Sequence, residues 1–270
     1  MRLSLQAPVV FSGVPVPDAE NPLLAAPQAR LVVEVSLERA GPLGGLEVEG
    51  LPVEVVEPLK AFWSNLQEGL GEAFGARLRV NVVLGRPGPS GLYAAVTVAL
   101  LHVLARMHSD VLESDEIVEL SRLADPFDYS DKPGWAGVMD ALRYATARGR
   151  VVAWRNDEEH GEIAEGGVGS LSYTGRSVRV SRRVSRDELG GDVYSAVVHL
   201  AGIATLAAAV KIRDGEDPIK AAWTYKPVDE AMALLLWGAP PPGGDCIYSP
   251  GFPGVLEIHC RGEGSRRGPV

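Results

Sequence analysis

The sequence predicts an α+β protein built from two units, and three observations support this prediction. A strand-like run at 76–84 enters a turn rich in glycine and proline, which opens into a long apolar helix. The order along the first part of the chain is strands, then helices, then a strand, with this long apolar helix at the centre. A polar stretch at 157–169, rich in glycine and glutamate, then divides the chain.

The first unit begins with strands and helices that local patterns indicate. Residues 30–38 alternate as a strand does, and 52–75 read as a helix with Gly75 at the C-cap position. Apolar residues recur in this helix at three- and four-residue steps, at Val53, Val56, Leu59, Phe62, Leu66 and Leu70. After the strand 76–84, the segment 91–108 is apolar on nearly every face, so we expect a helix buried deep in the unit.

Three more elements complete this unit. Ser114 with the acidic residues that follow it predicts an N-cap and a short helix to about residue 124. A proline- and aspartate-containing loop, 125–134, leads to a helix at about 135–147 and a strand at 150–155. We therefore expect one domain over 1–160.

The second unit is expected over 166–260 as a small α+β sandwich, with 261–270 as a flexible tail. Its expected elements are strands at 171–173 and 177–184, helices at 192–212 and 227–237, a proline- and glycine-rich loop at 238–244, and strands at 246–249 and 254–260.

Composition limits the classes of function. The chain has 270 residues, 46% hydrophobic and 23% charged, with a formal net charge of -9. This acidity argues against nonspecific nucleic-acid binding and against anionic membranes. The basic run 176–186 reads as a solvated strand edge. The apolar helix around 193–210 falls short of a clear span of about 20 residues.

The start of the chain shows no signal-peptide pattern, and we expect a cytoplasmic protein. Its two cysteines, Cys246 and Cys260, lack a metal-binding spacing, and we expect them to be reduced. No metal ligand is predicted.

The glycine loop at 85–91 is the strongest local indication of function. The first N–H groups of a helix have no partner inside the helix, and the helix dipole favours negative charge there. A strand, a glycine-rich turn and a helix N-terminus in this order therefore predict an anion site.

Three segments together resemble the GHMP kinases, the superfamily of galactokinase, homoserine kinase and mevalonate kinase. Pro87, Gly91, Leu92 and the run 94–99 match the second motif, P-x-x-x-G-L-G-S-S-A, and the helix that follows it. The opening APVVFSG…NPLLAAPQARLVVEV is similar to the family's first strand, proline turn and second strand, with Ala7, Pro8, Pro22, Leu24, Ala25, Ala26 and 31–35 in the corresponding places.

The third segment, KPGWAGVMD at 132–140, resembles the part of mevalonate kinase and galactokinase that carries the catalytic aspartate. Asp140 takes that place, and 145–154 follow it as the family's next turn and strand would. The loop 237–246 corresponds to the family's last glycine-rich loop. The resemblance implies an N-terminal domain with a left-handed βαβ unit, a ferredoxin-like C-terminal domain, and an active site between them.

The resemblance also implies roles for particular residues. Gly85, Arg86, Gly88, Ser90, Gly91 and Tyr93 would contact ATP, Asp140 and Lys132 would be catalytic, and Gly243 and Gly244 would contact substrate. Asp140 would accept or orient the proton of a substrate hydroxyl, with a surface aspartate as the simpler reading. Arg86 could grip phosphate, or cap a turn; Ser90 could contact phosphate or cap the helix.

All three motifs depart from the family pattern. The serine pair that holds phosphate and magnesium becomes Tyr93–Ala94 or Leu92–Tyr93, depending on register. Val10 stands where the first motif has a basic residue. Prolines 240–242 replace residues of the last loop whose N–H groups would face the ligand, and proline has no N–H.

Other side chains have a structural and a functional reading. Tyr93, Tyr129 and Trp135 could stack on adenine or belong to the core, and core packing is the commoner use of aromatic residues. His102 and His199 read as core histidines on apolar helices. Asp125, Asp128 and Asp131 could hold a cation, although their spacing matches no known metal loop.

Three hypotheses follow. The first is a kinase that uses ATP and Mg²⁺ to phosphorylate an alcohol of a small, mevalonate-like metabolite. The second is a catalytically inactive GHMP-fold protein that binds a ligand or a protein partner, which the altered motifs favour. The third is another phosphate-ligand chemistry on the same fold. A homodimer is left open.

Overall fold

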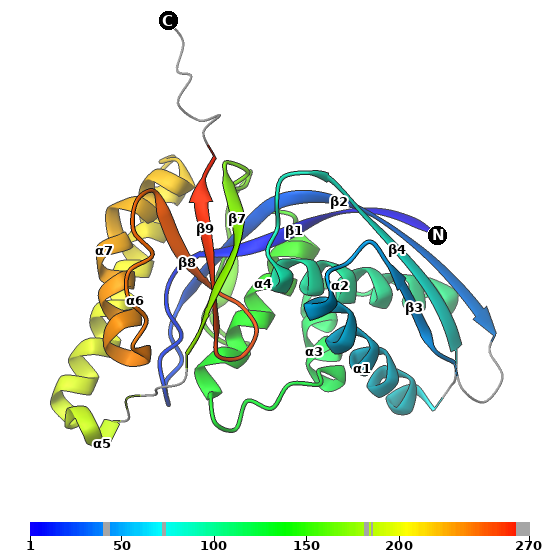
Figure 1. Ribbon diagram of the computed structural model, residues 1–270, viewed down its shortest axis with the longest axis horizontal. Coiled ribbons are helices and arrows are strands. Elements are labelled where there is room, and N and C mark those ends of the chain that lie inside the picture. Colours follow the sequence, from blue (N-terminus) through cyan, green and yellow to red (C-terminus); the bar gives the residue numbers. More distant parts are fainter. Residues whose placement is uncertain (40–43, 72–73, 181–183, 185, 263–270) are drawn as a thin grey trace, which may run out of the picture.

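The computed structural model describes residues 1–39, 44–71, 74–180, 184 and 186–262, and every structural statement below concerns these residues. The N-terminal part holds a sheet in which the long strand β2 pairs antiparallel with β1 along one edge (Figure 1). The other edge of β2 pairs with β4 along its second half and with β5 at its start. The strands are β1 (Arg2–Ser12), β2 (Leu23–Arg39), β3 (Leu46–Glu49), β4 (Phe74–Leu84), β5 (Val151–Trp154) and β6 (His160–Ala164).

Four helices, α1 (Val53–Leu70), α2 (Pro89–Met107), α3 (Ser114–Ala124) and α4 (Ala136–Arg148), cover one face of this sheet (Figure 1). Helices α2 and α4 pack directly on β1 and β2, and α1 and α3 pack on those two helices. Every residue of α2 from Ser90 to Leu101 is buried, which confirms the central helix expected from its composition.

The C-terminal part holds a three-stranded antiparallel sheet in the order β7–β9–β8, with helices at the end of the molecule (Figure 1). Its elements are β7 (Leu171–Arg179), α5 (Arg186–Leu189), α6 (Gly191–Arg213), α7 (Pro218–Trp237), β8 (Cys246–Pro250) and β9 (Val255–Arg261). The two parts share buried clusters; one of them joins Phe11 and Leu24 of the first sheet to Ile212, Ile219 and Ile247. The molecule therefore combines helices and sheets as the α+β prediction states.

Several helix ends differ from the predictions, because another residue caps the helix instead of the one that we expected. Helix α1 ends at Gly71, which adopts a left-handed φ of 67°, so Gly75 is free to pair in β4. Glu113, not Ser114, is the N-cap of α3: its N–H donates to Oε2 of Glu116 at 2.7 Å. Helix α7 begins at Pro218, because Asp217 caps it by accepting from the N–H of Lys220 at 2.9 Å.

The polar stretch expected to divide the chain contains a strand. Within 157–169, β6 pairs antiparallel with β5 and so extends the first sheet. The two predicted strands at 171–173 and 177–184 form one strand, β7, interrupted by a bulge between Tyr173 and Ser177. The basic run 176–186 begins on this edge strand, while 181–183, 185 and 263–270 lie outside the described residues.

The expectation of two reduced cysteines is wrong. Cys246 and Cys260 form a disulfide between β8 and β9, with their Cα atoms 3.9 Å apart. The cause is the register of the two strands, which places these residues directly opposite each other.

Two helices of the described chain are long and apolar enough to cross a membrane by length and composition: α2, whose most apolar window is 83% buried, and α6, whose window is 28% buried. The burial of α2 marks it as a core helix of a folded domain. Helix α6 has 23 residues, so the expectation that it falls short of a span of about 20 residues is wrong, and its exposure needs a different explanation.

Candidate functional site

The N-terminus of α2, where the sequence predicts an anion site, faces a carboxylate of the protein itself. The N–H of Ser90 donates to Oε1 of Glu257 at 2.8 Å. Glu257 lies on β9, 2% exposed. The carboxylate therefore stands where a bound anion would accept hydrogen bonds from the helix end.

Gly88 makes this close approach feasible. A Cβ built on Gly88 would lie 1.8 Å from Oε2 of Glu257 and 3.1 Å from Nε2 of His259. No side chain larger than hydrogen fits there unless Glu257 moves. The glycine of the loop thus serves to admit the carboxylate to the helix N-terminus.

A chain of hydrogen bonds holds Glu257 in place. Its Oε2 lies 3.2 Å from Nε2 of His259, and Nδ1 of His259 lies 2.8 Å from Nε2 of Gln28. The Gln28 amide also donates to the carbonyl of Leu171 at 3.0 Å. Because Gln28 donates to Nδ1, the proton of a neutral His259 lies on Nε2 and points at the Glu257 carboxylate.

The turn between β8 and β9 closes the same helix end. The N–H of Phe252 donates to Oγ of Ser90 at 2.8 Å, and a Cβ on Gly251 would lie 2.2 Å from that oxygen. The backbone N–H of Ser90 is bound to Glu257 and its hydroxyl oxygen accepts from Phe252. Pro89, the first helical residue, has no N–H to offer. Both polar groups of Ser90 at this helix terminus are therefore bonded from within the chain.

The other loop residues have packing roles. A Cβ on Gly91 would lie 2.2 Å from the carbonyl oxygen of Pro8, so this glycine lets α2 approach β1. Gly85 has a φ of 86° and packs on Ala29. Arg86 is exposed, and its carbonyl accepts from the N–H of Tyr173 at 2.8 Å.

Tyr93 points into the N-terminal core. Its ring is fully buried and lies 5.3 Å from Phe127 and 5.5 Å from Phe252, centroid to centroid. Its hydroxyl donates to Oδ1 of Asp125 at 2.9 Å, and Asp125 is ion-paired with the buried Arg143. Burial, followed by the nearby Asp125 charge, raises the pKa of Tyr93 far above its ordinary value. The Tyr93 hydroxyl is thus engaged in the core.

Asp140 lies on α4 and is 4% exposed. Its Oδ2 accepts from Nη2 of Arg122 at 2.8 Å, and the same Nη2 lies 2.7 Å from Oδ1 of Asp157. Burial raises the pKa of Asp140, against the opposing charge of Arg122. The aspartate that the family resemblance places in catalysis is therefore a buried partner of Arg122, which is 40% exposed and also pairs with the exposed Asp157.

A crevice of about 590 Å³ lies between the two parts of the chain, beside the loop and the β8–β9 turn. Lys132 and Arg179 bring positive charge to it, and Glu54, Asp128 and Glu257 bring negative charge. Its apolar walls are Pro58, Pro89, Pro126, Phe127, Val180, Phe252, Pro253 and Val255. Asp140 is not among the described residues that line it, so the structure does not bring Lys132 and Asp140 together in this crevice.

The last loop lies apart from this crevice. Gly243 and Gly244 adopt positive φ values of 76° and 55° in an exposed turn, and the carbonyl of Gly244 accepts from Nζ of Lys226 at 2.7 Å. Neither glycine is among the described residues lining the crevice. Their substrate contact stays a prediction.

The structural readings of the remaining side chains are favoured, with one exception. Trp135 is fully buried against Trp237, at a centroid distance of 5.6 Å, and Tyr129 packs on Phe127 at 6.2 Å. Within the described residues no three His, Cys, Asp or Glu side chains form a metal-binding group. His102 is only half-buried on α2, and the expectation of a core position is wrong for His199, which is exposed on α6.

Sequence reasoning missed Glu257 and His259. Both lie in an apolar strand, VLEIHC, and both are buried. An acid and a histidine two residues apart share one face of a strand. The two-residue spacing of Glu257 and His259 in the sequence could therefore have indicated that their side chains lie together.

Comparisons with known proteins identify the fold. No family model and no curated protein matches the sequence. Mevalonate kinase from L. major, solved in complex with R-mevalonate, is 13% identical, with 98% of this chain and 89% of that chain covered and a TM-score of 0.60. Phosphomevalonate kinase from Streptococcus pneumoniae is 10% identical, with 98% and 92% covered and a TM-score of 0.57. Mevalonate diphosphate decarboxylase from Staphylococcus aureus is 11% identical, with 98% and 88% covered and a TM-score of 0.55.

These neighbours are GHMP-superfamily proteins, and the likeness covers nearly the whole chain. The chain therefore has the GHMP-kinase fold, as the motifs predicted. Its sequence has diverged far from the neighbours, as the altered motifs indicate.

Proposed function

We propose that this chain is a GHMP-fold protein that binds a small organic anion in the crevice between its two parts and does not transfer phosphate from ATP. The observation that carries this proposal is the hydrogen bond from the N–H of Ser90 to the buried carboxylate of Glu257. The fold's expected phosphate site holds an anion that belongs to the chain.

The residues present do not fit ATP and Mg²⁺ at the α2 N-terminus. A phosphate placed there would meet the Glu257 carboxylate, and two like charges 4 Å apart repel by about 4 kcal/mol at an effective dielectric constant near 20. The hydroxyl of Tyr93, at the serine position of the family motif, is bonded to Asp125 at 2.9 Å. No step of a phosphoryl transfer can be derived from these contacts.

The crevice places two cationic side chains beside three carboxylates, and a small anion would bind at its cationic side. Its volume of about 590 Å³ lies within the usual size of a ligand pocket. Lys132 and Arg179 supply charge and hydrogen-bond donors for a carboxylate or phosphate group. Phe127 and Phe252 supply apolar surface for the body of the ligand.

The kinase hypothesis keeps the support of the fold, because neighbours are named mevalonate kinase and phosphomevalonate kinase. It would require Asp140 to leave Arg122 and to reach a substrate. Its mevalonate-like substrate, its cofactors and the cytoplasmic location all stay predictions.

Thermal unfolding of the full chain tests the proposal. Phenylphosphate and 3-phenylpropionate serve as probes of the crevice, since each joins an anion to an apolar ring. We expect one or both to raise Tm at millimolar concentration, and Lys132→Ala to remove most of that shift. Full retention of the shift in Lys132→Ala, or a shift with Mg·ATP and with neither probe, would overturn the proposal.

A further inference from the structure

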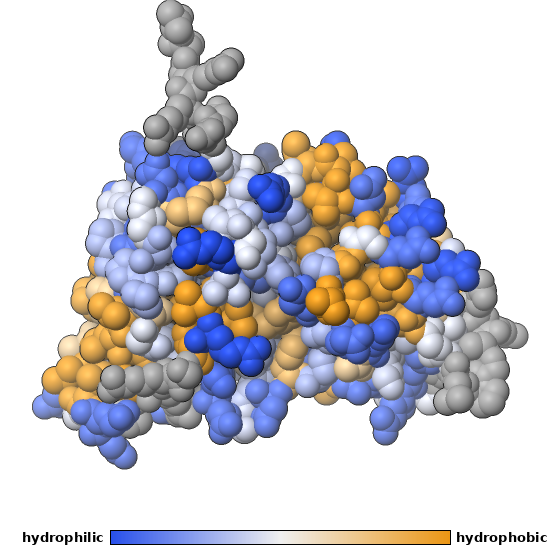
Figure 2. All heavy atoms as spheres, in the orientation of Figure 1, coloured by the Kyte–Doolittle hydropathy of each residue, from blue (hydrophilic) through white to orange (hydrophobic). Residues whose placement is uncertain are grey.

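Helix α6 has two apolar faces, although a surface helix needs only one. Its buried face carries Tyr194, Val197, Ala201, Ala204 and Ala208, which pack on the rest of the chain. Its opposite face exposes large apolar side chains to 44–61% of their surface: Val193, Leu200, Ile203, Leu206 and Val210. Apolar residues gather at this helical end of the molecule (Figures 1 and 2). An apolar face of this size on a soluble helix indicates a contact surface.

The exposed face has the spacing of a coiled-coil seam. Its residues follow each other at alternating steps of three and four, as Val193, Ala196, Leu200, Ile203, Ala207 and Val210. This is the heptad pattern that lets one helix pack along another. We call these six residues the α6 seam.

The α6 seam reads the same in both directions. Its order is valine, alanine, a large aliphatic residue, a second large aliphatic residue, alanine, valine. In a two-fold symmetric antiparallel pair, Val193 therefore meets Val210 of the second copy, and Leu200 meets Ile203 at the centre. Ala196 meets Ala207, so small residues face each other and the helices can approach closely. A two-fold contact requires such self-complementarity.

The charges at the two ends of α6 fit the same arrangement. Asp192 lies in the first turn, and Lys211 and Arg213 lie in the last turn. An antiparallel partner brings Arg213 of the second copy beside Asp192, and the two helix dipoles also oppose each other. A parallel pair would place like charges together.

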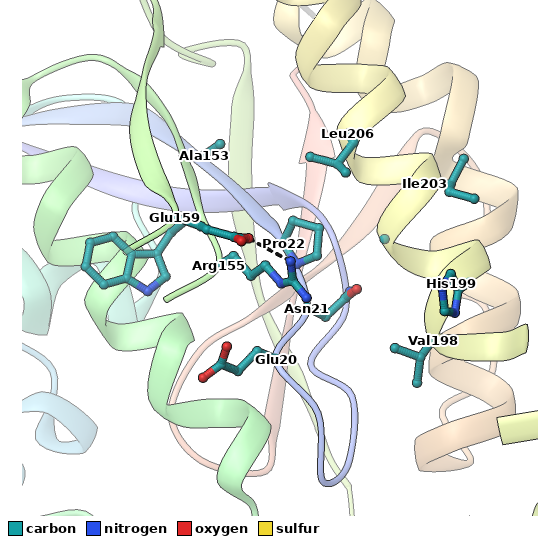
Figure 3. Close-up of a pocket in the computed structure, with 12 residues that line it drawn as sticks. Glu20, Asn21, Pro22, Ala153, Arg155, Glu159, Val198, His199, Ile203 and Leu206 are labelled. Carbon is teal, nitrogen blue, oxygen red and sulfur yellow. Dashed lines mark hydrogen bonds and ion pairs between the residues drawn. The ribbon is translucent and has the colours of Figure 1, made fainter. Parts of the chain in front are cut away.

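A groove of about 320 Å³ runs beside the α6 seam (Figure 3). Val198, His199 and Leu206 of α6 line it together with Pro22 and Trp154. In the antiparallel pair, the positions of His199 and Leu206 flank the seam, so the groove can take a side chain that projects from the second copy.

We propose that α6 is the interface of a two-fold homodimer, in which the α6 seams of two copies pack antiparallel. A lipid surface would use the apolar area but would not require the palindromic order or the opposite charges at the helix ends. The acidic chain, with a net charge of -9, also disfavours anionic lipid.

Sedimentation velocity on the full chain at micromolar concentration tests the dimer. We expect the wild-type chain to sediment as a dimer and Leu200→Glu to weaken association at least tenfold. Leu123→Glu is the matched control, because Leu123 is 78% exposed on α3, in the N-terminal part of the chain and away from α6, and it should leave the dimer intact. A monomeric wild-type chain overturns the proposal, and so does a chain that is monomeric and pellets with vesicles of phosphatidylcholine and phosphatidylglycerol.

A charge exchange tests the antiparallel register. Asp192→Arg and Arg213→Asp should each weaken the dimer, because each places like charges at both helix ends. The double variant should restore association toward that of the wild type. A double variant weaker than both single variants would contradict the antiparallel pairing.

Discussion

Replacing Glu257 by alanine removes the anion at the α2 N-terminus. The carboxylate accepts from the N–H of Ser90 at 2.8 Å and lies 3.2 Å from Nε2 of His259. Hydrogen bonds to a charged group contribute about 1.5–3 kcal/mol each, and a buried charge at a helix end contributes up to about 2 kcal/mol. Relief of the buried charge offsets part of this sum. We expect Glu257→Ala to lower the free energy of unfolding by about 3 kcal/mol.

The same variant should acquire an anion site, because the N–H of Ser90 loses its acceptor. Sulfate is the probe, and urea unfolding at constant ionic strength is the assay. With a Kd of about 2 mM, about 20 mM sulfate would raise the free energy of unfolding by about 1.4 kcal/mol. The wild-type chain should show no such gain.

Leu256→Ala provides the matched control for this experiment. Leu256 is the fully buried neighbour of Glu257 on β9, and its truncation costs about 2–5 kcal/mol by leaving a cavity. Leu256→Ala destabilises the chain but leaves Glu257 at the helix N-terminus, so sulfate should not raise the free energy of unfolding of this variant. Equal gains from sulfate in both variants, or a loss below about 0.5 kcal/mol in Glu257→Ala, would refute the reasoning.

Three further predictions concern buried groups. Gly88→Ala should lower the free energy of unfolding, measured in urea, by about 2–4 kcal/mol, because its Cβ would lie 1.8 Å from Oε2 of Glu257. This loss should be smaller when Glu257 is also replaced by alanine. Asp125→Asn should lower the free energy of unfolding by about 3–5 kcal/mol, because it leaves Arg143 buried without its ion pair. A decrease of less than about 1 kcal/mol would contradict this prediction. Burial raises the pKa of Asp229 to about 6. The folded state therefore binds this proton more tightly than the unfolded state. The free energy of unfolding should fall by about 2 kcal/mol as pH rises from 4 to 7, and Asp229→Asn should remove that component.

The sequence predicted the central helix because its signals are local. The turn before it supplies glycine and proline, and the run from Ser90 to Leu101 is apolar on all faces, so no distant contact was needed to place it. The same holds for the α+β fold class. The pairing of Cys246 with Cys260 depends on the register of β8 and β9, which the spacing of the two cysteines does not fix.

The candidate site depends on contacts between distant residues. Ser90 and Glu257 are separated by 167 positions, so the loop could be read as an open phosphate cradle until β9 was placed beside it. The sequence likewise shows that Tyr93 replaces a serine of the family motif. It does not show the hydrogen bond from Tyr93 to Asp125, which depends on how α2 packs against the loop after α3. Hydropathy identified α6 as apolar, but only the packing of the chain shows which face is exposed.

Calorimetric titration of the wild-type chain with Mg·ATP tests the central claim most directly, because it asks whether the α2 N-terminus is available to a phosphate. With Glu257 in place, we expect no saturable heat of binding up to about 5 mM Mg·ATP, which corresponds to a binding free energy weaker than about -3 kcal/mol. Saturable binding at micromolar Mg·ATP that Gly88→Ala abolishes would contradict the account.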